Sequence, residues 1–193
     1  MGPALPAIGP PVNHDDHVAL VRDGVRGAAG SWLELGAGDG AFTLALADVL
    51  GASGSMVAID RDGRALERLA TRVSVRFPAT ILETRRGDFT MDMPEGPFAG
   101  VLAANSLHFV DDLRPVLASI ATRLTPGGRL VVVEYDADRG NAWVPHPFSF
   151  RTWQRIAVDA GFREPQLLHR VPSRFLGAIY GALTTPRPDA LHT

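Results

Sequence analysis

A glycine-rich stretch, Gly36-Ala37-Gly38-Asp39-Gly40, directly follows the apolar run Trp32–Leu35. Glycine accepts positive φ angles and carries no side chain, so a ligand can lie directly against the backbone there. The periodic segment 41–50 predicts a helix, and the first N–H groups of that helix are free to bind a ligand. A strand, a glycine turn and a helix in this order are typical of a cofactor site, although other tight strand-to-helix turns also use glycine.

Two carboxylates follow at places where further strands are expected to end. Asp60 closes the apolar run 56–59, and an acid about twenty residues after such glycines can accept hydrogen bonds from both hydroxyls of a ribose. The alternative is that Asp60 only caps the next helix, and Asp60 taken alone does not separate the two interpretations. Asp88 is followed by Phe89, so this pair can offer a carboxylate to an adenine amino group and an aromatic face to its ring.

The segments that carry these residues alternate between short apolar runs and longer periodic ones. We expect a first helix that starts at 13–16 and ends before 27–30, strands at 31–35, 55–59, 80–84, 98–104 and 129–135, and helices at 41–50, 63–76, 111–124 and 148–161. This alternation predicts an α/β fold in which helices cover both faces of a parallel sheet. The last two runs, 166–171 and 174–183, are separated by two residues only, so they should pair antiparallel.

The length and composition favour one domain and exclude several classes of function. We expect a single domain at 13–185, with a flexible proline-rich arm at 1–12 and a tail at 186–193. The net charge is −2 and all 19 basic side chains are arginines scattered along the chain, which argues against a nucleic-acid partner. No run approaches the roughly 18 apolar residues of a membrane span, and residues 1–11 do not resemble a signal peptide, so we expect a cytoplasmic protein without a membrane partner.

The residue types that are missing narrow the chemistry further. The chain has no cysteine, which excludes disulfides, thiolate catalysis and zinc–thiolate sites. It also has no lysine, so no lysine nucleophile is available. No group of histidines and carboxylates shows the spacing of a metal site, and we therefore expect no metal.

Two more motifs complete a pattern along the chain. Asn105-Ser106-Leu107-His108 stands at the end of the expected fourth strand, and Thr125-Pro126-Gly127-Gly128 precedes the fifth. Together with the glycine loop and the two carboxylates, in this order and spacing, they make residues 31–136 resemble the class I S-adenosylmethionine-dependent methyltransferases. The resemblance implies a Rossmann-like, doubly wound sheet of seven strands in the order 3-2-1-4-5-7-6, mostly parallel and closed by an antiparallel C-terminal hairpin.

The same resemblance implies a cofactor and a reaction. The cofactor is S-adenosylmethionine and its product S-adenosylhomocysteine, with methyl transfer to an oxygen or nitrogen atom of a small-molecule acceptor by in-line displacement at the sulfonium. The implied cofactor-binding residues lie at the turns that follow successive strands: Glu34, Gly36, Ala37, Gly38, Asp60, Arg61, Asp88, Phe89, Asn105 and Leu107. Of these, Glu34 would order the loop and the amino-acid end of the cofactor, and Asn105 would meet its ammonium group.

His108 is the candidate catalytic residue, because an oxygen nucleophile usually needs a base and His108 follows the fourth strand at the edge where such sheets bind ligands. The alternative, which the sequence alone favours, is that its ring only packs beside the cofactor or starts the next helix. The segment after the fifth strand is aromatic, polar and irregular, which suits a substrate pocket. Its alternative is an ordinary loop that packs Trp143 and Phe148 into the core. The candidate substrate-binding residues are Tyr135, Arg139, Trp143 and His146.

Two other functions stay open from the sequence. An NAD(P)-dependent oxidoreductase shares the strand, the glycine loop and the distal acid, but its usual loop is Gly-x-Gly-x-x-Gly and this one is Gly-x-Gly-x-Gly. A protein of the methyltransferase fold could also bind the cofactor without transferring methyl. The oligomeric state is likewise open between a monomer and a homodimer.

Overall fold

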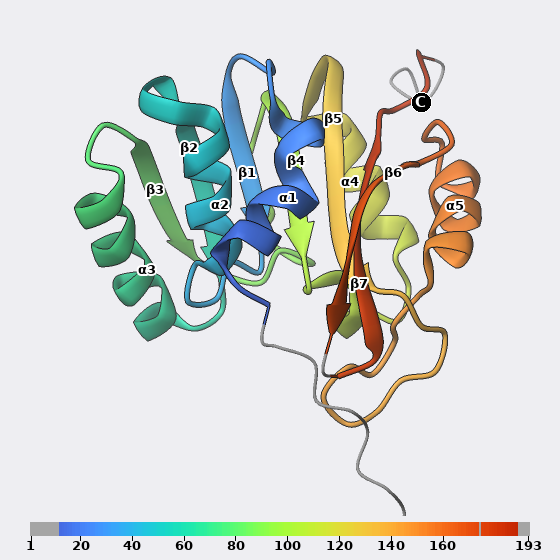
Figure 1. Ribbon diagram of the computed structural model, residues 1–193. Helices are drawn as coiled ribbons and strands as arrows, with labels where there is room; N and C mark the ends of the chain where they lie inside the picture. The colour runs from blue at the N-terminus through green and yellow to red at the C-terminus, as the bar shows by residue number, and fades with distance from the viewer. Residues whose placement is uncertain (1–11, 174, 189–193) are drawn as a thin grey trace, which may run out of the picture.

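The computed structural model describes residues 12–173 and 175–188, so most of the expected arm and part of the expected tail lie outside the described residues. The described chain forms one seven-stranded sheet in the order β3-β2-β1-β4-β5-β7-β6 (Figure 1). This order confirms the predicted α/β fold. The strands are β1 (Ser31–Leu35), β2 (Ser55–Asp60), β3 (Ile81–Arg86), β4 (Phe98–Ala104), β5 (Leu124–Tyr135), β6 (Gln166–Ser173) and β7 (Gly177–Thr184).

The first five strands pair in parallel, whereas β7 runs antiparallel to both β5 and β6. The predicted antiparallel C-terminal hairpin is therefore confirmed. Its second strand begins at Gly177, later than predicted, because β6 continues to Ser173, which pairs with Gly177. The pairing of Tyr135 with Ile179 places that turn at the same edge of the sheet as the end of β5.

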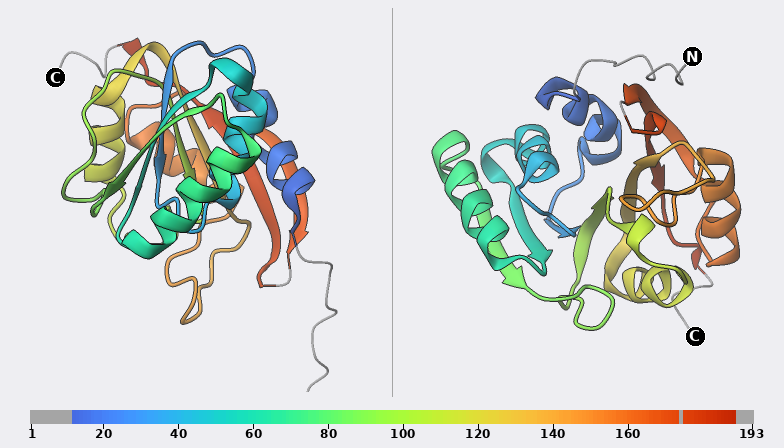
Figure 2. Two further views of the ribbon diagram at one scale, coloured as in Figure 1. Left: turned by 90° about the vertical axis from the view of Figure 1, so that its left-hand side faces the viewer. Right: turned by 90° about the horizontal axis from the view of Figure 1, so that it is seen from below.

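Helices cover both faces of the sheet (Figures 1 and 2). The helices α1 (His14–Val25), α2 (Ala41–Leu50) and α3 (Gly63–Arg76) lie on one face, and α4 (Arg114–Arg123) and α5 (Phe150–Asp159) lie on the other. Asn13 caps α1 by accepting a hydrogen bond from the N–H of Asp16 at 3.0 Å, which satisfies a backbone donor that the helix leaves free. Short 3₁₀ turns, η1 (Gly51–Ser53) and η2 (Leu107–Phe109), follow α2 and β4.

Several predicted boundaries are wrong by a few residues, and two of them have identifiable reasons. The helix predicted from residue 111 begins at Arg114, because the proline that follows fits the first turn of a helix and marks its start. The strand predicted from residue 129 begins at Leu124, since Leu124 already pairs with Phe98 before an irregularity in the register. Neither shift moves the residues at the carboxyl ends of the strands.

The core consists of two apolar layers, one on each side of the sheet. In one of them Trp32 of β1 lies over Gly100 of β4, its register partner. A Cβ atom at Gly100 would come within 2.4 Å of the Trp32 ring, so a glycine is required there. The parallel strands thus reach one edge together, and the connections after β1 to β5 gather at that carboxyl edge (Figure 1).

Candidate active site

A cavity of about 560 Å³ opens at the carboxyl edge of the sheet, in the size range of small-molecule sites. Its lining comes from the turns after β1, β2, β3 and β4, and consists of Gly36, Asp60, Arg61, Gly87, Phe89, Thr90, Asn105, Ser106, Phe109, Val110 and Asp111. Five of the predicted cofactor-binding residues are in that wall, namely Gly36, Asp60, Arg61, Phe89 and Asn105. The other five, Glu34, Ala37, Gly38, Asp88 and Leu107, do not line the cavity, but each lies within two positions of a residue that does.

The remaining wall residues were missed in the sequence, although each lies within three positions of a predicted one. Gly87 and Thr90 flank the predicted pair Asp88-Phe89, and Ser106 lies inside the motif that begins at Asn105. Phe109, Val110 and Asp111 lie in the connection from β4 to α4, at and after the end of η2. The motifs at the strand ends therefore predicted where each part of the wall lies. They did not predict which of the neighbouring side chains faces the cavity.

The glycine loop is held against the end of β2 by backbone hydrogen bonds. The N–H groups of Gly36 and Ala37 both donate to the carbonyl of Ile59, at 2.9 and 3.1 Å. Gly36 has a φ of +70°, and a Cβ atom there would lie 2.6 Å from the Cβ of Ser106. Both the conformation and the close approach of the β4 turn thus demand glycine at this position.

Asp60 joins the loop to the start of α3. One carboxylate oxygen accepts the N–H of Gly38 at 2.8 Å and the other accepts the N–H of Asp62 at 2.8 Å. The cap of α3 is Asp62, whose carboxylate accepts from Arg64 and Ala65, so the alternative reading of Asp60 as the helix cap is wrong. Each carboxylate oxygen of Asp60 can accept one further hydrogen bond, and Asp60 lines the cavity.

Asp88 is engaged by two neighbours. One of its oxygens accepts both the N–H and the hydroxyl of Thr90, at 2.9 and 2.7 Å, and the other forms an ion pair with Arg61. Partial desolvation opposes ionisation, but the hydrogen bonds from Thr90 and Arg61 prevail and lower the pKa of Asp88. The ionised carboxylate therefore holds Arg61 and Thr90, two residues of the cavity wall, in place.

Several buried polar atoms at the ends of β1 and β4 and in α2 have no hydrogen-bond partner among the described residues. These are Oε2 of Glu34, Oγ1 of Thr43, Oδ1 of Asn105 and Oγ of Ser106. Burial raises the pKa of Glu34 to about 8, with the Thr43 hydroxyl opposing and the charge of Asp60 reinforcing the shift. Unpartnered buried acceptors are costly, and native proteins keep few of them outside functional sites. Asn105 and Ser106 belong to the cavity wall, so a ligand that donates hydrogen bonds would satisfy them.

His108 is buried together with Glu134, the penultimate residue of β5. Their side chains are 3% and 0% exposed, and Nδ1 of His108 lies 2.7 Å from a carboxylate oxygen of Glu134. The other oxygen accepts the backbone N–H groups of Leu107 and His108 at 3.1 and 3.2 Å. Glu134 therefore ties the end of β5 to the η2 turn. The sequence signal for it was a single acid inside the apolar strand Leu130–Tyr135, and His108 itself is not part of the cavity wall.

The predicted substrate-binding residues occupy different positions along the carboxyl edge. Tyr135 is buried, and burial followed by the charge of Glu134 raises its pKa. Arg139 is exposed. His146 lies 3.6 Å from Asp111 of the cavity wall and its backbone N–H donates to the carbonyl of His108 at 3.0 Å.

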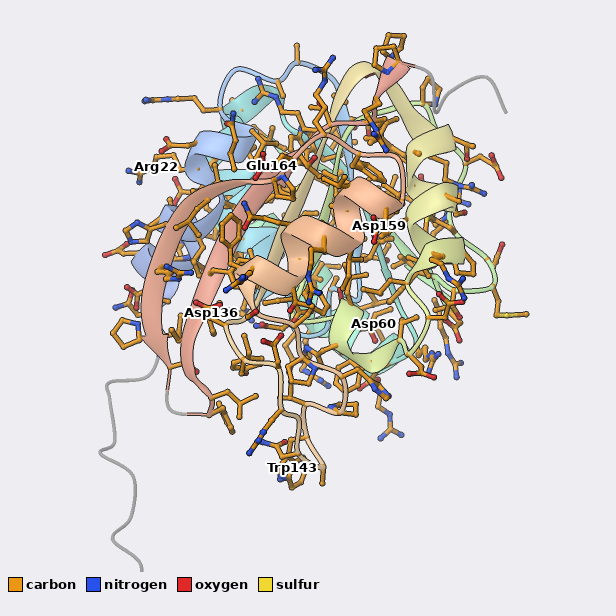
Figure 3. All side chains as sticks on the ribbon, turned by 90° about the vertical axis from the view of Figure 1, so that its right-hand side faces the viewer. Arg22, Asp60, Asp136, Trp143, Asp159 and Glu164 are labelled. Atoms are coloured by element: carbon orange, nitrogen blue, oxygen red, sulfur yellow. The ribbon has the colours of Figure 1, made fainter. Side chains whose placement is uncertain are left out.

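The positions of Trp143 and Phe148 bear on the alternative that this segment is an ordinary loop with both rings packed into the core. It is 79% exposed and points away from the body of the molecule at the far end of the loop between β5 and α5 (Figure 3). Phe148, in contrast, is buried and packs against Trp153 with ring centroids 5.7 Å apart. Of the two rings that an ordinary loop would bury, only Phe148 enters the core.

The described residues contain no helix that is long and apolar enough to cross a membrane. Within the same part of the chain, no three histidine or acidic side chains gather as metal ligands would.

Known proteins share both the sequence pattern and the architecture. Residues 33–132 match the family model described as a methyltransferase domain. The chain is 28% identical over 160 residues to an uncharacterised methyltransferase of Mycobacterium tuberculosis, with 78% of each chain covered. It is 27% identical over 128 residues to a 2-phytyl-1,4-naphthoquinone methyltransferase of Synechococcus elongatus, covering 66% of this chain and 52% of that protein.

A solved structure supports the same assignment at the level of the fold. CalO1, a methyltransferase in calicheamicin biosynthesis whose structure contains S-adenosylhomocysteine, superposes with a TM-score of 0.66 at 20% identity, covering 90% of this chain and 54% of that one. The family model spans more than half of the chain and includes the glycine loop, the carboxylates after β2 and β3 and most of β5. The chain therefore belongs to the methyltransferase domain family and is an S-adenosylmethionine-dependent methyltransferase.

Proposed function

We propose that the cavity binds S-adenosylmethionine and that the chain transfers its methyl group to an oxygen or nitrogen atom of a small-molecule acceptor. The observation that carries this proposal is the pair of buried wall oxygens, on Asn105 and Ser106, that have no hydrogen-bond partner among the described residues. An ammonium group is a donor-only cation, so the amino-acid end of the donor would supply what these atoms lack.

The other wall residues fit the remaining parts of the donor. The free acceptor positions of Asp60 suit the hydroxyls of a ribose, and Phe89 offers an apolar face for an adenine ring. Arg61 already pairs with Asp88, so the Asp88 carboxylate has one oxygen less available for an adenine amino group than the sequence implied. We infer that Asp88 contributes mainly by fixing Arg61 and Thr90.

When bound, the donor supplies a methyl group on a sulfonium, which is already an activated electrophile. The contribution of the chain is then to place the acceptor in line and to exclude water. Phe109 and Val110 add apolar side chains to the wall beside Asn105 and Ser106. The acceptor would enter on that side, since the polar side of the cavity is matched to the donor.

The position of His108 favours a supporting role. Its Nδ1 is held by Glu134 and its side chain is 3% exposed behind Phe109, so the pair fixes the turn that presents Asn105, Ser106 and Phe109 to the cavity. Removal of a proton from the acceptor by His108 stays a prediction, and it requires Nε2 to reach the bound acceptor. The small-molecule character of the acceptor is supported by the named reaction of the Synechococcus relative.

The change Asp60→Asn tests the donor site. It replaces a charged acceptor, and loss of hydrogen bonds to a charged group should weaken S-adenosylhomocysteine binding about tenfold to a hundredfold. Asp159→Asn is the matched control, since Asp159 is exposed at the end of α5 and should leave binding unchanged. Isothermal titration calorimetry measures both affinities.

The same titration separates the proposal from its rivals. Binding of NADH with no binding of S-adenosylhomocysteine would overturn the proposed function and favour an oxidoreductase. Binding of S-adenosylhomocysteine without any turnover of S-adenosylmethionine, over a panel of hydroxyl and amine acceptors, would favour a protein that binds the donor without transferring methyl.

A further inference from the structure

Four aromatic rings form a row along the carboxyl edge of the sheet. Phe109 contacts His108 with ring centroids 4.3 Å apart, His108 lies 5.9 Å from Tyr135, and Tyr135 lies 6.3 Å from Phe175. The rings come from three separate segments, namely η2, the end of β5 and the turn between β6 and β7. Segments far apart in the sequence thus contribute adjacent rings at the edge where the cavity opens.

The two ends of this row are exposed while its middle is buried. Phe109 is 64% and Phe175 66% exposed, whereas His108 and Tyr135 are 3% and 9% exposed. Large apolar side chains in water are normal when they are scattered, but exposed rings held by a buried support beside a cavity mark a binding surface. The buried histidine and tyrosine fix the two outer rings and do not themselves offer contact area.

Phe109 connects this row to the donor cavity. It lines the cavity together with Val110 and Phe89. A molecule stacked on Phe109 would therefore lie directly beside the donor site. From Phe109, the row of rings runs away from the donor site, past Tyr135, to Phe175.

The chemistry of these rings selects a class of acceptor. Aromatic side chains bind other aromatic rings by offset stacking or edge-to-face contact, which adds to the apolar area that any hydrocarbon would bury. Two acidic side chains on this edge lie near basic ones, since Asp111 is 3.6 Å from His146 and Asp136 pairs with Arg170 at 2.8 Å. Stacking is the interaction that the two exposed rings themselves offer.

We propose that the acceptor is a planar aromatic molecule that stacks on Phe109 and extends along the ring row towards Phe175. This inference rests on the proposed function, since it names the acceptor class for the same site. It assigns Phe109 as the residue that determines specificity for the acceptor, with Phe175 as the outer contact.

Binding of 2-naphthol to the protein saturated with S-adenosylhomocysteine tests this inference. Its saturated counterpart, decahydro-2-naphthol, keeps the carbon skeleton and the hydroxyl but has no aromatic face. Stacking predicts that 2-naphthol binds about threefold to tenfold more tightly. The change Phe109→Leu should abolish this preference, Phe109→Tyr should keep it, and Phe175→Ala should reduce it.

Controls and a separate donor titration make each outcome decisive. Val75→Ala, at an exposed apolar position on α3 away from the carboxyl edge, should change nothing. Equal affinity for the two probes, or a preference that survives Phe109→Leu, would overturn the aromatic acceptor. In either case an unchanged affinity for S-adenosylhomocysteine would leave the proposed function standing, whereas absence of that binding would remove the proposed function itself.

Discussion

Single residues at this site combine a structural and a chemical role. Asp60 holds the glycine loop through Gly38 and still lines the cavity, and Asp88 orders Arg61 and Thr90 through its ionised carboxylate. Glu34 differs from both, because it is 2% exposed and one of its oxygens has no partner among the described residues. Such a group favours its neutral form, which makes the stability of the protein depend on pH.

The change Glu34→Gln should remove that dependence. The folded pKa of Glu34 is about 8, and the ordinary value is 4.5, so the folded protein binds the proton more tightly than the unfolded chain. The contribution of Glu34 to the free energy of unfolding is complete below pH 4.5. It is lost as the pH rises towards 8, at up to about 1.4 kcal/mol per pH unit. Near pH 7 the variant without ligand should therefore be more stable than the parent, and below pH 4.5 the two should agree.

Urea unfolding at a series of pH values measures this difference, with Glu67→Gln on the exposed side of α3 as the control. A difference between variant and parent that stays constant with pH would contradict the raised pKa. The variant should also bind S-adenosylhomocysteine less tightly, because the Glu34 carboxyl can lose its proton beside a bound ammonium group and a glutamine amide cannot.

At the level of elements, the site depends on contacts between strand ends that are distant in the sequence. The η2 turn follows β4, yet its conformation is fixed by Glu134 from the neighbouring strand β5, which accepts the N–H groups of Leu107 and His108. The register of β4 with β5, in which Ala104 pairs with Val133, brings these ends together. The parallel sheet thus positions the wall of the cavity by its register as well as by its order.

The change Glu134→Gln should loosen this turn. A glutamine oxygen can still accept the backbone N–H groups of Leu107 and His108, but an amide NH₂ then faces Nδ1 of His108 in place of a carboxylate oxygen. Loss of a buried charge-assisted hydrogen bond costs about 1–3 kcal/mol. We expect a lower free energy of unfolding together with weaker S-adenosylhomocysteine binding. Glu95→Gln, at an exposed partner of Arg123, is the control. Parental stability and donor binding with loss of turnover alone would instead indicate that His108 acts on the acceptor directly.

At the level of the whole molecule, binding of the donor product should stabilise the fold. A ligand that binds only the folded state at a hundred times its Kd adds about 2.7 kcal/mol, and in a chain of this size that raises Tm by roughly 5–10 °C. A thermal melt with saturating S-adenosylhomocysteine checks this, with NADH at the same concentration as the comparison. Equal shifts with both compounds, or a shift with NADH alone, would contradict selective binding of the methyl donor.

The sequence predicted the fold and the donor half of the site better than the acceptor half. The family resemblance implied the strand order, and the short gap before the last strand predicted the antiparallel hairpin. Gly36, Asp60 and Asn105 lie in the cavity wall because each stands at the carboxyl end of a strand. The pairing of His108 with Glu134 could not be predicted, since it joins residues 26 positions apart through side-chain packing. Trp143 and Phe148 lie in the same predicted segment, so the sequence did not show that Phe148 is buried and Trp143 exposed.

The hydrogen bonds between the glycine loop and β2 have a consequence for how a ligand is received. Ile59 accepts from Gly36 and Ala37, and Asp60 accepts from Gly38, so hydrogen bonds within the protein itself hold the backbone of the loop. Binding then requires little loss of backbone entropy in this segment, which is the benefit of preorganisation. The donor should associate with a rigid receptor, and differences in affinity among donor analogues should reflect their contacts and not the ordering of the loop.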